Sequence, residues 1–309
     1  MLADHIAYVA LVSADAAATA AVFERQLGLP RHDLAAAAGT IAVFSVGRSA
    51  LAVAPPGHPL VDGETKPGVH HIALDVDDLA GTAARAAAAG IPGAAAAPGL
   101  AGRRTVTLDR AATVGVRTVL TERLELREHG GGPVERIDHI GVASADVFED
   151  ERVFTGKLGF PVESRQTDME VAMAVESFTS DKYGVVYHTR APEPVGGLRV
   201  YFITVGDCEL EFLANFDPRQ GGHAHERGQP GNTRQDQGVI ARFVKSRGRG
   251  LHHVALKVTD IGATLSAMVE AGLPMIDVKG RPGSRRALIG FPHPSAVGGV
   301  LMHLVQRDV

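Results

Sequence analysis

The sequence predicts an α+β fold of two tandem domains, each assembled from two units that run strand, helix and then several strands. The main observation is a strand-like opening that recurs four times along the chain. Three copies run into an acidic turn, and the second and fourth continue as an apolar segment that ends at a glycine. Internal self-similarity of this kind defines an architecture before any single motif does. The four openings are Asp4-His5-Ile6-Ala7-Tyr8-Val9, Val69-His70-His71-Ile72-Ala73-Leu74-Asp75-Val76, Ile137-Asp138-His139-Ile140-Gly141-Val142 and Gly250-Leu251-His252-His253-Val254-Ala255.

The first domain is expected to span residues 1–126. Alanine-rich or apolar segments closed by glycine predict its helices, and short apolar runs bounded by glycine or proline predict its strands. Charge followed by three glycines predicts a linker at residues 127–133. After the opening strand, the expected elements are a helix at Asp15–Leu27, strands at Ile41–Val46, Ala50–Ala54 and Val69–Val76, a helix at Leu79–Ala89, a loop at Ile91–Leu100, and strands at Thr105–Leu108 and Val116–Thr121.

The second domain is expected to span residues 134–309. It contains a polar insert at Asp217–Gly238, and loops of this length are usually functional or disordered. His223 and His225 lie in that insert, as a weak candidate for a metal pair. The other expected elements are strands at Arg136–Ala143, Val171–Glu176, Val185–Thr189, His253–Val258 and Val300–Val305, a hairpin of Leu198–Val205 with Glu209–Leu213, and helices at Val147–Leu158, Val239–Val244 and in the segment that ends at Gly272.

Two strands near the end of the chain each aim a histidine at an apolar face. Because strand side chains alternate with period 2, Leu251, His253 and Ala255 are expected to share one face. Leu301, His303 and Val305 are expected to do the same. A single inward histidine is more often a hydrogen-bonded core residue than a ligand, but the repetition of the pattern favours a shared site.

Composition excludes several functional classes. Hydrophobic residues make up 45% and charged residues 21% of the 309 residues, as in an ordinary soluble protein. The net charge of −4 shows no excess of positive charge that would bind nucleic acid. The dense basic run Lys245–Arg249 is expected to be a solvated loop. One cysteine, no basic leader and no membrane-length apolar run predict a cytoplasmic protein without a membrane partner. The expected partner is a small-molecule substrate, and a homodimer is left open.

These motifs resemble the vicinal-oxygen-chelate superfamily, which includes glyoxalase I, methylmalonyl-CoA epimerase and the extradiol dioxygenases. The second domain is similar to methylmalonyl-CoA epimerase. The resemblance implies that each domain pairs two βαβββ units into a curled, cup-like mixed sheet around a divalent metal. The matching pieces, in order, are Ile137-Asp138-His139-Ile140, Val205-Gly206-Asp207-Cys208-Glu209-Leu210-Glu211, Ile240-Ala241-Arg242-Phe243, Gly250-Leu251-His252-His253, and Phe291-Pro292-His293-Pro294 with Gly299-Val300-Leu301.

The resemblance implies four ligand positions in the second domain, two per unit. They fall at His139, Glu211, His253 and His303, where the epimerases carry a glutamate at the last position. Imidazole and carboxylate ligands suit Zn, Co, Mn, Ni or Fe, and one divalent ion is expected. In the alternative interpretation His303 is a packed residue and no metal binds.

In the first domain the same positions predict no metal. The resemblance puts His5 and His71 at the first and third positions. The second and fourth fall at Ala52 and Val119, neither of which can bind a metal. This domain is expected to be a scaffold with a degenerate site, although a metal shared between domains or subunits would use the two histidines.

The resemblance implies chemistry through an enolate next to a carbonyl group. The favoured function is a metal-dependent epimerase or isomerase of an acyl-CoA or of a polyhydroxy ketone such as a cyclitol. A second epimerase carboxylate would fall near Val200, which cannot act, so the candidate acid–base residues are Glu211, Glu209 and His303. Two alternatives stay open: an Fe(II)-dependent ring-cleaving or keto-acid dioxygenase, and a non-catalytic protein of the resistance type that sequesters its ligand.

Overall fold

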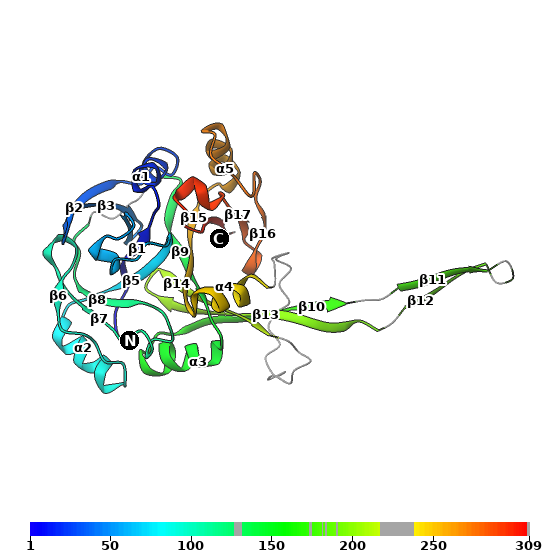
Figure 1. The fold of residues 1–309 in the computed structure, drawn as a ribbon, viewed down its shortest axis with the longest axis horizontal. Helices are drawn as coiled ribbons and strands as arrows, with labels where there is room; N and C mark the ends of the chain where they lie inside the picture. The colour runs from blue at the N-terminus through cyan, green and yellow to red at the C-terminus, as the bar shows by residue number, and fades with distance from the viewer. Residues whose placement is uncertain are drawn as a thin grey trace.

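The computed structural model describes residues 1–126, 132–172, 175–180, 182, 184–189, 191–216 and 238–307. It contains two curled eight-stranded sheets, one from each half of the chain, with helices packed on their outer sides (Figure 1). The two tandem domains predicted from the repeats are therefore confirmed. Residues 127–131 of the expected linker, and the insert with His223 and His225, lie outside the described residues.

Each domain repeats the order of strands and helices twice. The elements of the first domain are β1 (Ile6–Val12), α1 (Ala16–Arg25), β2 (Arg31–Ala36), β3 (Gly39–Val46), β4 (Ser49–Ala54), β5 (Gly68–Val76), α2 (Leu79–Ala88), β6 (Ala97–Pro98), β7 (Arg104–Thr107) and β8 (Thr118–Glu122). Those of the second are β9 (Val134–Ala143), α3 (Val147–Glu151), β10 (Val162–Ala172), β11 (Val175–Ser180), β12 (Gly184–Thr189), β13 (Glu193–Val205), β14 (Cys208–Phe216), α4 (Val239–Arg247), β15 (Gly250–Val258), α5 (Ile261–Glu270), β16 (Arg281–Pro282), β17 (Leu288–Gly290) and β18 (Met302–Gln306).

The strand order places the four repeated openings at the centres of the sheets. The first sheet runs β2-β3-β4-β1-β5-β8-β7-β6, and the second runs β10-β13-β14-β9-β15-β18-β17-β16. In the second sheet the two openings, β9 and β15, pair antiparallel, and each pairs parallel with the last strand of its own unit. Four strands that carry candidate ligands are therefore consecutive neighbours.

The acidic turns of the repeat start helices. Asp15, Asp78 and Asp260 occupy the N-cap positions of α1, α2 and α5. Each carboxylate accepts a hydrogen bond from the backbone N–H three residues later, at 2.9, 3.0 and 2.9 Å. An N-cap of this kind satisfies one of the otherwise unpaired N–H groups of the first turn, which explains why the turn recurs in the sequence. Among the helices of the described ranges, none has the length and apolarity needed to cross a bilayer.

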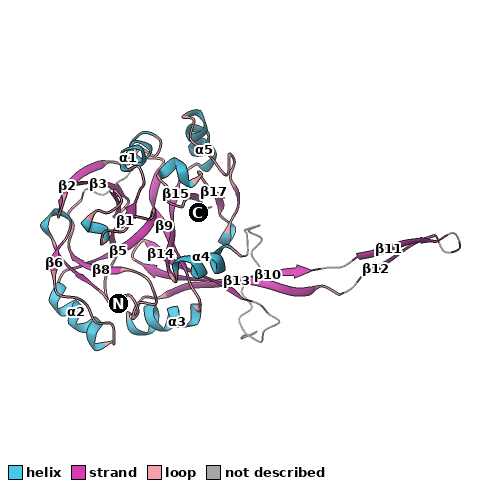
Figure 2. Cartoon of the chain, viewed as in Figure 1, coloured by secondary structure: helices cyan, strands magenta, loops and turns pink. Residues whose placement is uncertain are grey.

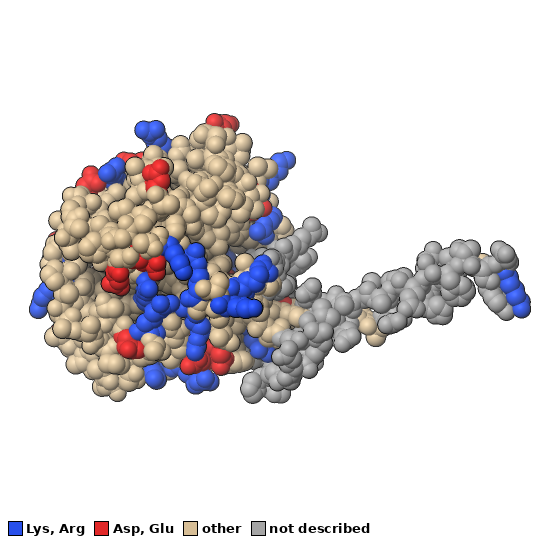
Figure 3. Space-filling view, viewed as in Figure 1, with Lys and Arg blue, Asp and Glu red and all other residues tan. Residues whose placement is uncertain are grey.

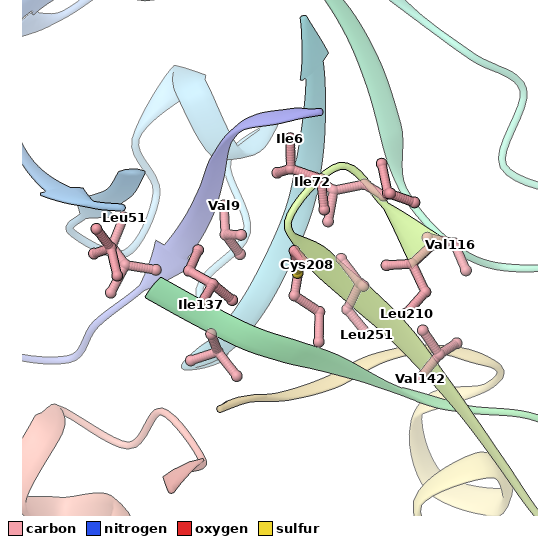
Figure 4. Close-up of a cluster of buried hydrophobic side chains, with 14 of the residues drawn as sticks. Ile6, Val9, Leu51, Ile72, Val116, Ile137, Val142, Cys208, Leu210 and Leu251 are labelled. Atoms are coloured by element: carbon pink, nitrogen blue, oxygen red, sulfur yellow. The ribbon is translucent and has the colours of Figure 1, made fainter. Parts of the chain in front are cut away.

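One hydrophobic core joins the two domains. Figure 4 shows Ile6, Val9 and Ile72 of the first domain gathered with Leu210 and Leu251 of the second. All five belong to a continuous cluster of buried residues on the helix-covered faces of both sheets. Smaller apolar clusters occupy the opposite faces, inside the two cups. The two sheets therefore pack through a shared core and leave each cup as a separate cavity.

The central pair of the second sheet has three register shifts, and two of them are β-bulges beside the candidate ligands. His139 pairs with Ala255 while Ile137 pairs with Leu256, so Asp138 is an extra residue in β9. His252 is the extra residue in β15, between the pairs of Leu251 and His253. A bulge shifts the alternation of side chains by one. The prediction that Leu251 shares a face with His253 is therefore wrong, because Leu251 packs into the shared core.

Polar edge strands are among the elements that the sequence did not predict. β2 and β10 lie at the outer edges of the two sheets, and β2 alternates between exposed residues and half-buried ones, of which Leu34 and Ala36 pack against the apolar cluster of the first cup. The β11–β12 hairpin projects away from both domains (Figure 2). The helix expected at Val147–Leu158 is α3 followed by a π-helical turn at Arg152–Lys157. Pairing with a neighbouring strand at the sheet edge, rather than a hydrophobic pattern, determines the strand conformation of β2 and β10.

Asp150 in α3 makes the stability of the fold depend on pH. The residue is buried, and burial raises the pKa of its carboxyl to about 7, against a hydrogen bond from Ser144 that lowers it. The folded protein then holds a proton that the unfolded chain loses above pH ~4, so stability should fall as pH rises from about 4 to about 7. The full shift corresponds to about 4 kcal/mol. Asp150→Asn is expected to flatten this slope in thermal melts at a series of pH values, and an unchanged slope would contradict the assignment.

Candidate metal centre

The structure brings the four predicted ligand residues of the second domain together. They project from four neighbouring strands into the cup: His139 from β9, Glu211 from β14, His253 from β15 and His303 from β18. The carboxylate oxygen Oε2 of Glu211 lies 3.4 Å from Nε2 of His139 and 3.3 Å from Nε2 of His253. The ligand atoms of the three histidines lie within 4.8 Å of one another. All four side chains are buried.

The donor atoms of this cluster have the arrangement that a metal needs. Among the described residues, Nδ1 of His303 is buried without a hydrogen-bond partner, and Nε2 of His253 faces the Glu211 carboxylate at 3.3 Å, out of good hydrogen-bond geometry. Buried polar atoms are rarely left unpaired, because the lost hydrogen bond to water is costly. Three imidazoles within 4.8 Å of one another, with a carboxylate beside two of them, are a donor set that suits Zn²⁺ or a neighbouring transition metal. The residues present therefore fit a divalent ion.

The electrostatics of the cup favour neutral side chains at His253 and His303 and an ionised carboxylate at Glu211. Burial lowers the pKa of His253, although the facing Glu211 opposes this, and burial lowers the pKa of His303 well below its usual range. For Glu211, burial raises the pKa, but the positive charge that His139 and His253 carry when protonated, with a hydrogen bond from His253, more than offsets it and brings the pKa to about 2. Neutral imidazole and ionised carboxylate are the forms that coordinate metals.

Residues behind two of the histidines fix their orientation. Nδ1 of His139 lies 2.7 Å from Oδ1 of Asp138, which is fully buried. Arg307 donates to both oxygens of Asp138, at 2.9 and 2.6 Å. Nδ1 of His253 lies 3.0 Å from Nδ1 of His252, so in both ligands Nε2 is the nitrogen left for the cup. Outer partners of this kind set the tautomer and ring orientation of ligand histidines. The bulges explain the contacts, because adjacent residues in a regular strand point to opposite faces.

Gly141 leaves the space that the His253 ring occupies. It pairs with Glu211 on one side and with His253 on the other. A Cβ atom at this position would lie 2.0 Å from Cε1 of His253, which is much closer than atoms can approach. The ring would have to leave its position for any other residue to fit.

Gly141→Ala is therefore expected to displace His253 and to weaken metal binding about 10- to 100-fold, the range seen when groups that orient ligands are lost. The measurement is competition with a chromogenic chelator. Gly156→Ala is the matched control, because a Cβ there meets no atom within 4 Å. Equal metal affinities for the two variants would contradict the steric argument.

The cup is mostly apolar above the ligand cluster. Its cavity has a volume of about 320 Å³ and includes Phe202, Ile289 and Phe291 among its walls. The basic groups in the lining are engaged: Arg281 pairs with Asp277 at 3.1 Å, and Arg307 pairs with Asp138. The site thus combines a polar floor with hydrophobic walls, as small-molecule sites do.

The other two candidates for acid–base chemistry differ in position. His303 lies in the cup with the ligands. Glu209 is not among the cup-lining residues, because its carboxylate pairs with Arg285, which also pairs with Glu163 at 2.7 Å. Val200 is buried, in the apolar cluster that includes Phe202.

In the first domain the strand register corrects one assignment. Ala10 pairs with both Ala52 and His71, as Gly141 pairs with Glu211 and His253. Counting back two residues places Tyr8, and not His5, at the position equivalent to His139. His5 instead pairs with Asp75 at 3.2 Å. The Asp-His dipeptide suggested His5, which lies three residues before the structurally equivalent residue, Tyr8.

The first-domain cup holds Tyr8, Ala52, His71 and Val119 at the four positions, which is not a metal-binding set. His71 lies within 3.4 Å of the Tyr8 hydroxyl and 2.8 Å of His70. We therefore expect His71→Ala to keep the metal content of the parent by elemental analysis. A variant that lost its metal would indicate a site shared with this domain.

Comparison with known proteins agrees with the fold and the repeats. The family model for the Glyoxalase/Bleomycin resistance protein/Dioxygenase superfamily matches residues 4–106 and 136–289. Mitochondrial methylmalonyl-CoA epimerase from Bos taurus is 25% identical over 194 residues, which covers 62% of this chain and 87% of the relative. The enzyme of the same name from Homo sapiens is 26% identical over 140 residues, 45% of this chain and 68% of the relative.

Solved structures extend the likeness to both domains. A mutant of 4-hydroxymandelate synthase from Streptomyces coelicolor superposes with a TM-score of 0.61 at 16% identity, over 100% of this chain and 94% of its own. BphC, a halotolerant catechol dioxygenase, gives a TM-score of 0.55 at 16% identity, over 99% and 88%. These values establish a common two-domain fold. With the family model matched in both halves, the chain belongs to the glyoxalase/bleomycin resistance protein/dioxygenase superfamily.

Proposed function

We propose that the second domain is a metal-dependent epimerase or isomerase that acts on a hydrogen next to a carbonyl group. The observation that carries the proposal is an ionised carboxylate, Glu211, held between two histidines at the floor of an apolar cup. Superfamily membership and the 25% identity to an enzyme named methylmalonyl-CoA epimerase support the same reaction class.

The residues assigned to the metal are His139, His253 and His303, with Glu211 as the fourth ligand or as a loosely held neighbour. A divalent ion bound there would act as a Lewis acid on substrate oxygens. Asp138 and Arg307 would hold His139 in position, and His252 would do the same for His253. The apolar walls would exclude water from the reacting carbon, which strengthens the electrostatic interactions at the floor.

Glu211 is the residue that we assign as the base. Its pKa of about 2 keeps it ionised, which is necessary for accepting a proton, although a low pKa also makes it a weak base. A substrate whose carbon acid is activated needs only a modest base placed within hydrogen-bond distance. Once Glu211 holds the abstracted proton, it can return that proton, or a deuteron exchanged from solvent, to the enolate; His303 lies in the same cup but stays assigned to the metal, because a neutral imidazole of lowered pKa is a poor acid.

The lining of the cup favours one of the two substrate classes. A polyhydroxy ring would need many hydrogen-bond partners, because each buried hydroxyl left unpaired costs free energy. The walls are instead dominated by aliphatic and aromatic side chains, and both lining arginines face carboxylates. We therefore favour the acyl group of a thioester such as an acyl-CoA, or a compact keto compound, over a cyclitol.

Deuterium exchange tests this function. The purified protein is analysed for metals and then incubated in D₂O with branched acyl-CoA thioesters and simple ketones. We expect about one divalent ion per chain and exchange of the hydrogen next to the carbonyl, lost on chelation and restored on reloading. Bound metal without exchange on any of these compounds would overturn the proposal. Absence of stoichiometric metal would instead favour a ligand-sequestering protein.

One contact supports a second candidate. Glu211 touches both His139 and His253, and two histidines with one carboxylate are the usual ligands of non-haem Fe(II) oxygenases. In that case His303 would be an additional neighbour, and the function would be ring cleavage or keto-acid oxidation. Oxygen consumption by iron-loaded protein, with no deuterium exchange, would replace the epimerase proposal with this one.

A further inference from the structure

A cleft between the two domains gathers positive charge away from the metal centre. It has a volume of about 200 Å³, several times the ~30 Å³ of one water molecule. Figure 3 shows Lys and Arg side chains collected in the middle of this face, near α4. The lining includes one carboxylate, from Glu64. The basic residues of the lining, here called the interdomain basic cleft, are Lys66, Arg110, Arg117, Arg247 and Arg249.

Carboxylates balance only part of this charge. Arg117 lies 3.8 Å from Glu64, and Arg249 pairs with Glu149. Arg110 and Arg247 donate to backbone carbonyls instead, and a carbonyl accepts a hydrogen bond without cancelling a charge. A guanidinium has five N–H groups, so each of these arginines keeps donors for a ligand.

The cations are held in place by bonds that cross the domain boundary. Arg110 of the first domain donates to the carbonyls of Gly115 and, at 3.1 Å, of Arg249 in the second. Arg247 donates at 3.1 Å to the carbonyl of Pro67 in the first domain. These bonds fix like charges close together before any ligand arrives, which is the preorganisation that an anion site requires. Burial lowers the pKa of Arg110, and repulsion from the positive charge of Arg117 lowers it further.

The cleft continues into the first-domain cup. His70, Arg110 and Arg117 line both the cleft and an adjacent cavity of about 350 Å³ that contains Tyr8 and His71. The domain without a metal-binding set therefore still offers a ligand a neighbouring pocket. The cleft and the metal cup share none of their described lining residues. The ring of Phe243, which lines the cleft, packs at 4.7 Å against the ring of His252, which lines the cup, so this ring pair separates the two cavities.

We propose that the interdomain basic cleft binds a phosphate or diphosphate group, either free or as part of an ester. Guanidinium groups match the oxygens of phosphate in geometry and charge, and an ammonium adds a point charge. The backbone carbonyls that orient Arg110 and Arg247 carry no net charge, so they leave the positive charge of these arginines available to the anion. The basic run Lys245–Arg249, expected from the sequence to be a solvated loop, belongs to α4 and to the strand connection that forms one wall of this cleft.

Titration calorimetry with inorganic diphosphate at low salt tests the proposal on the intact protein. We expect saturable binding that Lys66→Glu weakens about tenfold or more, the size expected when one charge-assisted contact is lost. Lys279→Glu makes the same change of charge at an exposed residue outside the cleft and should bind like the parent. Absence of binding in the parent, or equal binding by the two variants, would overturn the proposal.

Two further titrations show where the anion binds and whether it is free or part of an ester. His253→Ala removes a proposed metal ligand and should leave diphosphate binding intact, so failure of the metal assignment does not affect this test. Loss of diphosphate binding in that variant would place the anion at the metal and overturn the cleft site. ADP and CoA are titrated next, and binding much tighter than that of diphosphate would identify an ester as the ligand. Equal affinities would identify the free anion.

Discussion

A double variant, His139→Ala with His253→Ala, is expected to retain no stoichiometric divalent metal. The two rings come from the antiparallel pair at the centre of the sheet, and Glu211 contacts both of them. Their removal leaves His303 and Glu211, which is one imidazole and one carboxylate. Tightly bound transition metals in proteins have three or four protein ligands, so two are insufficient.

Elemental analysis after gel filtration in metal-free buffer measures this effect. The matched control removes two histidines from the other half of the chain, His5→Ala with His71→Ala, and should keep the parental metal content. Circular dichroism shows whether each variant is folded. A full equivalent of metal in the His139/His253 variant would disprove the assigned site.

The second large effect is expected for Glu211→Gln. The amide keeps an oxygen that can face a metal, but it cannot accept a proton, so metal content should be largely retained. Exchange of the substrate hydrogen with deuterium should fall on the order of 100-fold or more, which is the usual contribution of a general base. Proton NMR of the substrate in D₂O measures the rate directly.

Glu209→Gln is the matched control, because it makes the same chemical change two residues away on the same strand. Glu209 pairs with Arg285 outside the cup lining, so we expect nearly parental exchange. A reversal of the two results would move the base to Glu209. His303→Glu gives the cup a second carboxylate at the fourth predicted ligand position, and metal binding should tolerate it.

The fold was predictable because its signals are local and repeated. Four similar openings and three capping aspartates specify units that can be recognised without knowing their neighbours. β2 and β10 were not predictable, since an edge strand with exposed polar residues has no hydrophobic alternation to mark it. Their strand conformation results from pairing with β3 and β13.

The candidate site was predictable only where its residues follow strand alternation. The four predicted ligands of the second domain do lie together, but Asp138, Gly141, His252 and Arg307 have roles that no spacing indicated. Two of them sit in bulges, which depend on how two strands pair. In the first domain the Asp-His dipeptide, identical to the one at His139, pointed to His5. The strand pairing, in which Tyr8 faces Ala73, shows that Tyr8 occupies the position equivalent to His139.

The paired bulges have a consequence for how the proposed metal would enter the protein. The first domain has the same irregularities at Ala7 and His70, although its cup holds no metal-binding set. Backbone pairing alone therefore produces this geometry, in contrast to zinc fingers, whose folding requires the ion. We therefore expect the metal to be removed from such a cup and restored while the chain stays folded. The identity of the bound ion would then follow from the supply of free metals in the cell and from relative affinity, rather than from events during synthesis.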